Sequence, residues 1–106
     1  MVQQVDDLGF KEALSTNGVV AVKFYADWCG SCKLFAPKFR RISDEDEMSG
    51  ITFLDVNAEQ NEEARKAAGV DNLPFLAVFK DGKLIEGSAT SKEDYFRTMI
   101  SKALES

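Results

Sequence analysis

The chain has 106 residues, of which 44% are hydrophobic and 29% charged, a composition typical of one globular domain that we expect to span residues 1–106. Its net charge of −5 disfavours nucleic acid as a partner, because an acidic surface repels phosphate groups. The chain contains no histidine, which excludes Cys-His proteases, Ser-His-Asp hydrolases and every metal site that needs an imidazole.

Residues 1–7 do not show the basic and then apolar pattern of a secretory signal. The longest apolar run, residues 19–26, is interrupted by Lys23 and is too short to span a bilayer. We therefore expect a cytoplasmic protein that does not bind membranes. In that compartment, a pair of cysteines is more often catalytic or metal-binding than structural.

The first elements alternate in type. We expect a short strand at residues 1–5 and then a helix that is capped by Asp6 or Asp7 and stopped by Asn17-Gly18. Residues 19–25 form a nearly continuous apolar run rich in β-branched side chains, which is typical of a strand buried on both faces. The inward face of this first helix should carry Phe10, Ala13 and Leu14.

A long helix is predicted over residues 31–48, with a kink at Pro37. A strand at residues 51–56 and a helix at residues 59–68, ended by Gly69, should follow. Side chains at helical spacing in the long helix are Leu34, Phe35, Phe39 and Ile42, and one side of the shorter helix carries Ala64, Ala67 and Ala68.

The last third predicts a hairpin and a final helix. Residues 75–79 and 84–85 are apolar and flank Lys80-Asp81-Gly82-Lys83, a strong hairpin signal because glycine adopts positive φ without steric cost. The helix should open at Ser91, with Asp94 completing a capping pattern. Its inward side chains should be Phe96, Met99, Ile100, Ala103 and Leu104.

The resulting order, β-α-β-α-β-α-β-β-α, predicts an α/β fold. Its first half implies parallel strands joined by right-handed crossovers, and its end adds an antiparallel hairpin. We expect a central mixed sheet of about five strands, flanked on both faces by about four helices.

Cys29 and Cys32 are separated by two residues and lie where a buried strand meets a helix. A sulfur at a helix N-terminus is stabilised as the thiolate by backbone N–H groups and the helix dipole. This context favours a redox-active pair, in which Cys29 attacks a disulfide and Cys32 resolves the mixed disulfide. A zinc site shared by two copies and a purely structural disulfide are the alternatives.

Two segments resemble the signatures of the thioredoxin family. Val-Lys-Phe-Tyr-Ala-Asp-Trp-Cys-Gly-Ser-Cys-Lys at residues 22–33, followed by Ala36-Pro37, is similar to the family's active-site segment. Asn72-Leu73-Pro74, followed by an apolar strand and Lys80-Asp81-Gly82, is similar to its second signature. The resemblance covers essentially the whole chain and implies the thioredoxin fold.

The resemblance also implies roles for individual residues. Cys29 would be the attacking thiolate and Cys32 the resolving thiol. Trp28 would form one wall of the substrate groove. Pro74 would be a cis-proline facing the cysteines, and the backbone of Leu73 would be free to pair with an extended substrate.

The residues between the cysteines, Gly30 and Ser31, should tune the redox poise. Most thioredoxins have proline at the position of Ser31, whose hydroxyl can instead donate to the sulfur of Cys29. Redox proteins of this fold differ by roughly 150 mV, so the spacing of the cysteines alone does not distinguish a reductant from an oxidant. The rest of the chain favours a reductant.

Lys23 and Asp55 form a second departure from the family. Thioredoxins usually carry a buried aspartate where this chain has Lys23, facing a lysine where it has Asp55. A buried lysine needs a partner or must lose its proton, and Asp55 is the expected partner. Either the pair keeps a proton-handling role with reversed polarity, or it is a structural ion pair or a lysine that extends to solvent.

Two further departures concern the substrate groove. Phe75 follows Pro74 where the family usually has threonine, and Ser88 stands near the position of a groove glycine. A side chain in the groove would narrow the range of substrates and leave the cysteine chemistry unchanged.

These features predict a monomeric electron carrier that reduces disulfides in client proteins, needs no cofactor or metal, and is re-reduced by a flavin-containing thioredoxin reductase. The resemblance implies clients such as peroxiredoxins and ribonucleotide reductase. The alternatives are a disulfide isomerase or oxidase domain and a thioredoxin-fold binding module. The intact pair of cysteines argues against a pure binding module.

Overall fold

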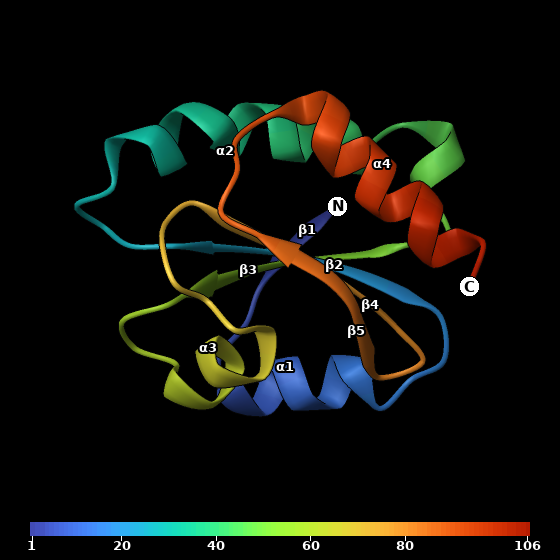
Figure 1. Ribbon diagram of the computed structural model, residues 1–106, viewed down its shortest axis with the longest axis horizontal. Coiled ribbons are helices and arrows are strands. Elements are labelled where there is room, and N and C mark those ends of the chain that lie inside the picture. The colour runs from blue at the N-terminus through green and yellow to red at the C-terminus, as the bar shows by residue number, and fades with distance from the viewer.

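The computed structural model describes all 106 residues as one five-stranded mixed sheet between two layers of helices (Figure 1). The strand order is β1-β3-β2-β4-β5; β1, β3 and β2 are parallel, and β4 and β5 run antiparallel to their neighbours. The strands are β1 (Val2–Gln4), β2 (Val19–Tyr25), β3 (Thr52–Asn57), β4 (Phe75–Lys80) and β5 (Lys83–Ser88). The helices are α1 (Asp7–Leu14), α2 (Gly30–Ser43), α3 (Glu62–Ala68) and α4 (Glu93–Leu104), with a 3₁₀ turn η1 (Asp46–Met48) after α2.

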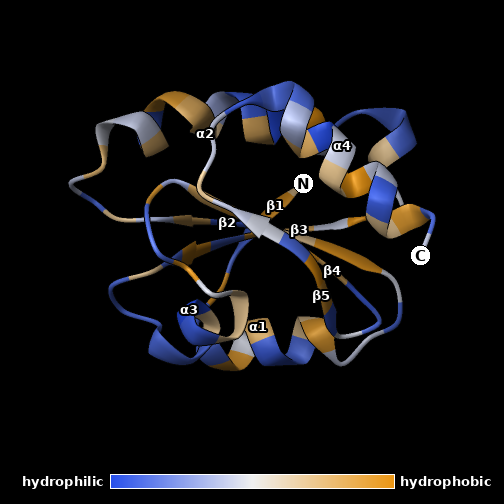
Figure 2. Cartoon of the chain, viewed as in Figure 1, coloured by the Kyte–Doolittle hydropathy of each residue, from blue (hydrophilic) through white to orange (hydrophobic).

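Helices α2 and α4 cover one face of the sheet and α1 and α3 cover the other (Figure 1). The three inner strands are hydrophobic along most of their length (Figure 2) because side chains from both of their faces enter a core. On the α2 and α4 side, the ring of Phe39 lies 5.5 Å from those of both Phe53 and Phe96. On the other side, Phe10 lies 5.5 Å from Phe79. The predicted α/β architecture is confirmed.

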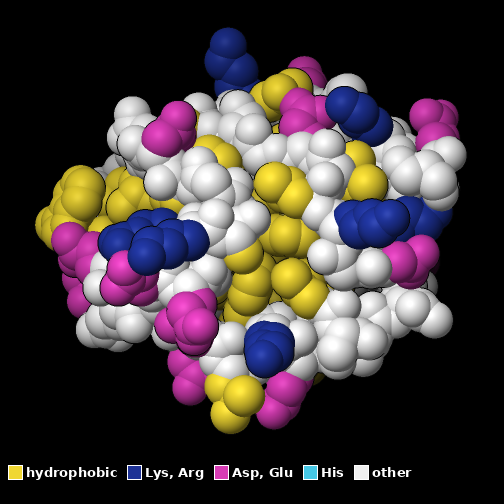
Figure 3. All heavy atoms as spheres, turned by 60° about the horizontal axis from the view of Figure 1, so that its bottom comes forward, with side chains coloured by type: hydrophobic (Ala, Val, Ile, Leu, Met, Phe, Trp, Pro, Cys, Tyr) yellow, Lys and Arg dark blue, Asp and Glu magenta, His cyan; other side chains and the backbone are white.

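The side of the molecule that carries α1 and α3 shows hydrophobic side chains between charged ones (Figure 3). A cavity of about 230 Å³ lies there, lined by Phe10, Leu14 and Ala67 among others. Helix α3 faces α1 with alanines, which are too small to fill the space between the two helices. Ala64 and Ala68 are buried, whereas Ala67, expected on the same inward side, is exposed.

The predicted helix over residues 31–48 was too long at its C-terminal end. Helix α2 ends at Ser43, and the backbone of Glu45 is extended (φ −69°, ψ 141°). Met48, the last residue of η1, is buried in the core. The hydroxyl of Ser43 donates to the carbonyl oxygen of Arg40, 2.7 Å away. Serine and aspartate favour such local bonds over continued helix, which explains the break at Ser43 and Asp44.

Helix α3 begins three residues later than predicted because a turn comes first. The amide oxygen of Asn57 accepts from the N–H of Glu59, and the amide of Asn61 donates to the carbonyl of Asn57. The carboxylate of Asp7 then accepts from the N–H of Ala64 at 2.8 Å, so a residue of α1 caps α3. At the other end, Gly69 adopts the predicted left-handed conformation (φ 72°).

The predicted capping pattern of Ser91 and Asp94 was wrong. Helix α4 begins at Glu93 without a side-chain cap, and the hydroxyl of Thr90 accepts from the N–H of Lys92. Leu104, expected to point inward, is largely exposed, whereas the other four inward residues are buried. The predicted hairpin is confirmed, with positive φ at Asp81 (51°) and Gly82 (84°). None of the helices combines the length and the apolar character that crossing a bilayer requires.

Candidate active site

Cys29 and Cys32 form a disulfide at the junction of β2 and α2. Cys29 is the N-cap of α2, and its sulfur accepts from the backbone N–H of Cys32 at 3.2 Å. The hydroxyl of Ser31 lies 3.6 Å from the same sulfur. Gly30 begins the helix in open space, and a Cβ there would meet no atom within 4 Å. Two hydrogen-bonding groups, the N–H of Cys32 and the hydroxyl of Ser31, therefore lie at the Cys29 sulfur.

Both cysteines are almost completely buried, with Cys29 3% and Cys32 2% exposed. They form a small cluster with Ala26, and Leu73 packs against it. In the disulfide form, the exposed fractions of the two side chains therefore differ negligibly. Their hydrogen bonds, rather than their exposure, distinguish the two sulfurs.

Leu73 packs against this cluster, and the peptide bond between Leu73 and Pro74 is cis, as the resemblance implied. Pro74 is buried and immediately precedes β4. The N–H of Leu73 donates to the side chain of Asn72 at 2.9 Å, whereas its carbonyl oxygen accepts no hydrogen bond. The expectation that the Leu73 backbone is free is therefore correct for its carbonyl and wrong for its amide.

Trp28 is 69% exposed next to the disulfide. Its indole N–H donates to a carboxylate oxygen of Glu59 at 2.8 Å. Trp28 and Leu73 line the same cavity of about 260 Å³. Glu59 was missed by the sequence reasoning. The sequence did contain a signal for Glu59, because this residue follows β3. The strands β2 and β3 are parallel, so their carboxyl ends lie at the same edge of the sheet.

The structure does not bring Ser88 and Phe75 into this cavity. Ser88 is half-buried at the end of β5, opposite Leu76. Phe75 is 4% exposed, and its ring packs edge-on against Phe24 in the core. The expectation that Phe75 narrows the groove is therefore wrong, because the alternation of side chains along β4 turns it into the core.

Lys23 and Asp55 face each other on neighbouring strands, as expected. The nitrogen of Lys23 is 3.3 Å from Asp55 Oδ1, and the two side chains are 4% and 21% exposed. The same oxygen has no hydrogen-bond partner, so the contact is an ion pair without good hydrogen-bond geometry. Burial raises the pKa of Asp55, and the charge of Lys23 opposes that rise.

The face of β2 that carries Lys23 looks toward α2. The nitrogen of Lys23 is 5.5 Å from the ring centroid of Phe39 and 5.6 Å from that of Tyr25. Cys32, Phe35 and Phe39 are spaced along the buried face of α2. The lysine therefore lies beneath the same helix face as the second cysteine.

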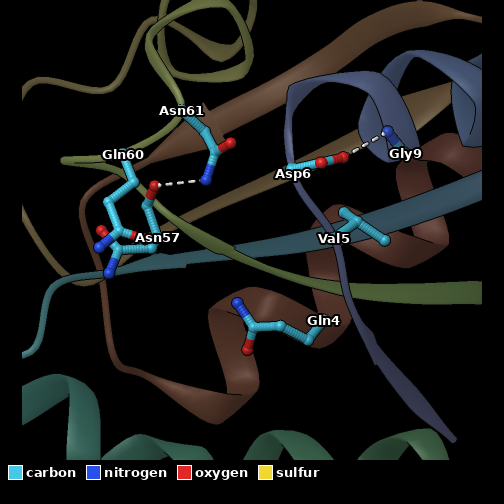
Figure 4. A pocket seen from close by; sticks show the side chains of 7 residues that line it. All are labelled: Gln4, Val5, Asp6, Gly9, Asn57, Gln60 and Asn61. Carbon is cyan, nitrogen blue, oxygen red and sulfur yellow. Dashed lines mark hydrogen bonds between the residues drawn. The ribbon is translucent and has the colours of Figure 1, made fainter.

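The largest cavity, about 450 Å³, lies away from the disulfide, between the start of α1 and the β3–α3 turn (Figure 4). Its polar side chains mainly hold backbone: Asp6 accepts from the N–H of Gly9, and the amide of Asn61 donates to the carbonyl of Asn57. It contains no sulfur or other strong nucleophile. We therefore assign it a role in joining α1 to the turn before α3 rather than in the chemistry.

Comparisons with known proteins agree with this geometry. The thioredoxin family model matches residues 1–102. Thioredoxin-1 of Schizosaccharomyces pombe is 40% identical over 87 residues, which cover 81% of this chain and 82% of that protein. A longer S. pombe protein described as a protein disulfide-isomerase is 35% identical over 104 residues, and this chain spans 21% of its length.

Solved structures show the same fold. The thioredoxin of Malassezia sympodialis has a TM-score of 0.87 at 26% identity and covers 96% of this chain, with 92% of its own chain matched. A thioredoxin f2 structure, solved with ferredoxin:thioredoxin reductase, has a TM-score of 0.86 at 25% identity, with 99% of this chain and 96% of that chain covered.

Proposed function

The chain belongs to the thioredoxin family of thiol–disulfide oxidoreductases, and we propose that it reduces client-protein disulfides with Cys29 as the attacking and Cys32 as the resolving sulfur. The observation that carries this assignment is the pair of donors at the Cys29 sulfur, the N–H of Cys32 and the hydroxyl of Ser31. Both donors and the N-terminus of α2 favour negative charge on Cys29. No comparable donor contacts the sulfur of Cys32.

The reaction has two exchange steps. The Cys29 thiolate attacks one sulfur of the client disulfide; the client S–S bond breaks, a mixed disulfide forms, and one client thiolate leaves. The Cys32 thiolate then attacks the Cys29 sulfur, breaks the mixed disulfide and releases the second client thiolate. The client gains two electrons and two protons, and the Cys29–Cys32 disulfide is re-formed.

A reductase must then return two electrons to the disulfide. The thioredoxin f2 similar to this chain was solved in complex with ferredoxin:thioredoxin reductase, which supports re-reduction by a thioredoxin reductase here. We infer that the protein acts as a monomeric electron carrier in the cytoplasm, with clients such as peroxiredoxins, and that it contributes to redox homeostasis there.

We assign client binding to Trp28, Leu73 and Pro74. Trp28 and Leu73 line one cavity, and Leu73 packs against the cysteines. The Leu73 carbonyl is available to accept a client N–H. A client carbonyl that sought the Leu73 N–H would have to displace the side chain of Asn72.

We assign redox tuning to two groups of residues, Gly30 and Ser31 between the cysteines and the buried pair of Lys23 and Asp55. Gly30 leaves room at the helix start, and Ser31 supplies a hydroxyl where a proline would supply none. The cation of Lys23 beneath α2 favours thiolates at the cysteines, and its ion pair with Asp55 offsets part of that effect.

Reduction of insulin by the full chain, with dithiothreitol or a thioredoxin reductase as electron donor, tests the proposal. We expect activity well above background, complete loss in Cys29→Ser, and a stable mixed disulfide with client in Cys32→Ser. A chain that bound partners without redox turnover would show only background activity. A mixed disulfide that formed through Cys32 in Cys29→Ser would reverse the assignment of the sulfurs.

A further inference from the structure

We propose that the α2 side of the disulfide recognises an acidic client segment that also carries an apolar side chain, with Leu34 as the apolar contact and Lys38 as the cation. The inference rests on the proposed function, because it assigns a client class to that same site. It concerns the side of the disulfide opposite to Trp28.

A small cavity adjoins the disulfide on this side. It measures about 180 Å³ and is lined by Ser31, Leu34, Phe35, Lys38 and Ser91. Ser31 connects this cavity to the site, because its hydroxyl is 3.6 Å from the Cys29 sulfur. A client segment attached to the attacked sulfur can therefore reach it within a few residues.

Leu34 gives this cavity an exposed apolar edge. Its side chain is 78% exposed, more than that of Trp28. The sequence grouped Leu34 by helical spacing with Phe35, Phe39 and Ile42, but only the other three are buried. A large apolar side chain that lies beside a reactive disulfide, and is not needed for the core, is a natural contact for a partner.

The charge of α2 is the second observation. The helix contains Lys33, Lys38, Arg40 and Arg41 and no carboxylate, although the whole chain has a net charge of −5. Only Arg41 forms an ion pair, with Glu93 at 2.8 Å. A cation in the first turn of a helix, such as Lys33, opposes the helix dipole. Arg40 and Arg41 lie in the last turn, where the dipole favours cations, so only the charges of Lys33 and Lys38 are not explained by the stability of the helix.

The other side of the disulfide carries the opposite charge. Glu59 and Asp71 line the cavity that contains Trp28, and the cation there, Arg65, donates to the carbonyl of Ala58. A client that crosses the disulfide thus meets carboxylates on one side and Lys38 on the other. Charge complementarity of this kind sets orientation and association rate. It favours a client whose acidic residues lie over α2.

Two synthetic peptide disulfides test the proposal. The two peptides have the same sequence except on one side of the cysteine. There, one peptide carries a leucine and two aspartates, and the other carries a leucine and two lysines. We expect the full chain to reduce the acidic peptide with a higher kcat/KM by about fivefold at low salt, a preference that shrinks as salt rises. Lys38→Glu should abolish or reverse the preference, and Leu34→Ser should lower kcat/KM for both peptides.

Lys83→Glu is the control, because it makes the same charge change at the start of β5, outside the cavity beside α2. It should leave the preference for the acidic peptide intact. The small neutral compound hydroxyethyl disulfide reports the chemistry alone, and Lys83→Glu should reduce it as fast as the unaltered chain does. An unchanged preference in Lys38→Glu would overturn the α2 assignment while leaving the proposed function in place. Failure of the unaltered chain to reduce hydroxyethyl disulfide would instead overturn the proposed function.

Discussion

At the scale of single residues, Lys23 is a charged side chain in the core, where its removal from water costs free energy of folding. Its nitrogen is removed from water, and its one carboxylate partner, 3.3 Å away, accepts no hydrogen bond at the facing oxygen. A hydrophobic residue of similar shape is often as stable as a buried ion pair. The position beneath the buried face of α2 suggests that the charge serves the thiols above it.

The first prediction concerns Lys23→Met. Removing a cation from beneath α2 makes the thiolate form less favourable, so the rate of client reduction should reach half its maximum at higher pH, by roughly 0.5–1 on the pH scale. The rate of insulin reduction, measured over a pH series, checks this. The maximum rate at high pH should change little.

Asp55→Asn is the matched variant, because it removes the opposing charge and keeps Lys23. The profile should then move to lower pH, since the uncompensated cation favours thiolates more strongly. Coincident profiles for the two variants and the unaltered chain would mean that the pair is only structural.

Sequence reasoning located residues whose role depends on type and spacing. It placed the two cysteines at the strand–helix junction, the cis peptide bond before Pro74, and the contact between Lys23 and Asp55. It missed Glu59 and the bond from the Leu73 N–H to Asn72, because their partners are set by how loops pack at the edge of the sheet. A single sequence does not encode such contacts as a local pattern.

At the scale of elements, the ring of Phe75 on β4 restricts which residue can occupy position 87 on the neighbouring strand β5. A Cβ at Gly87 would lie 2.9 Å from the ring of Phe75 and 3.2 Å from the carbonyl oxygen of Ala68. The bulky residue after Pro74 is therefore accommodated by the absence of a side chain on β5. Phe75, one of the departures from the family, therefore acts through packing in the core.

The second prediction follows from this contact. Gly87→Ala should lower the free energy of unfolding by about 1–3 kcal/mol, because the added methyl group overpacks the site. Chemical denaturation monitored by circular dichroism measures the loss. Phe75→Leu in the same chain should recover part of it, which a double-mutant cycle detects as coupling.

Gly50→Ala provides the control, since a Cβ at Gly50 would meet no atom within 4 Å. It should leave the free energy of unfolding nearly unchanged. An equal loss in Gly87→Ala and Gly50→Ala, or no recovery with Phe75→Leu, would refute the packing argument.

The type and order of every strand and α-helix were predictable, whereas the 3₁₀ turn η1 and several ends were not. Strand and helix types follow from hydrophobic patterning, which is clear in the continuous apolar run of β2 and in the two apolar segments of the hairpin. The ends of α2, α3 and α4 depend on individual hydrogen bonds between side chains and the backbone, which are weaker than the hydrophobic pattern. Asp7 caps α3 from a different helix, and α4 begins without the cap that Ser91 seemed positioned to supply.

At the scale of the whole molecule, four charged side chains join α2 to α4. Arg97 donates to both carboxylate oxygens of Glu45, at 2.9 and 2.6 Å, and to Glu93 at 3.0 Å. Glu93 also accepts from Arg41 at 2.8 Å. The network connects the helix that carries the cysteines to the C-terminal helix, and it spans more than fifty residues of sequence, so no local pattern predicts it.

The last prediction concerns acid stability. The hydrogen bonds of Glu93 with Arg41 and Arg97 lower its pKa from 4.5 to about 2, and the bond to Arg97 lowers the pKa of Glu45. A carboxyl whose pKa is lowered by folding stabilises the folded state above its unfolded pKa, and this contribution is lost as the pH falls toward the folded value. The melting temperature should therefore fall between about pH 5 and about pH 2.

Glu93→Gln should show a lower melting temperature than the unaltered chain near neutral pH and a smaller further fall on acidification, so that the two converge near pH 2. Glu12→Gln, which removes a carboxylate that forms no ion pair, should follow the unaltered chain throughout. Because solvent reaches these side chains, added salt should narrow the gap near neutral pH. A gap between Glu93→Gln and the unaltered chain that stayed constant from neutral pH to pH 2 would show that Glu93 acts through packing and not through its charge.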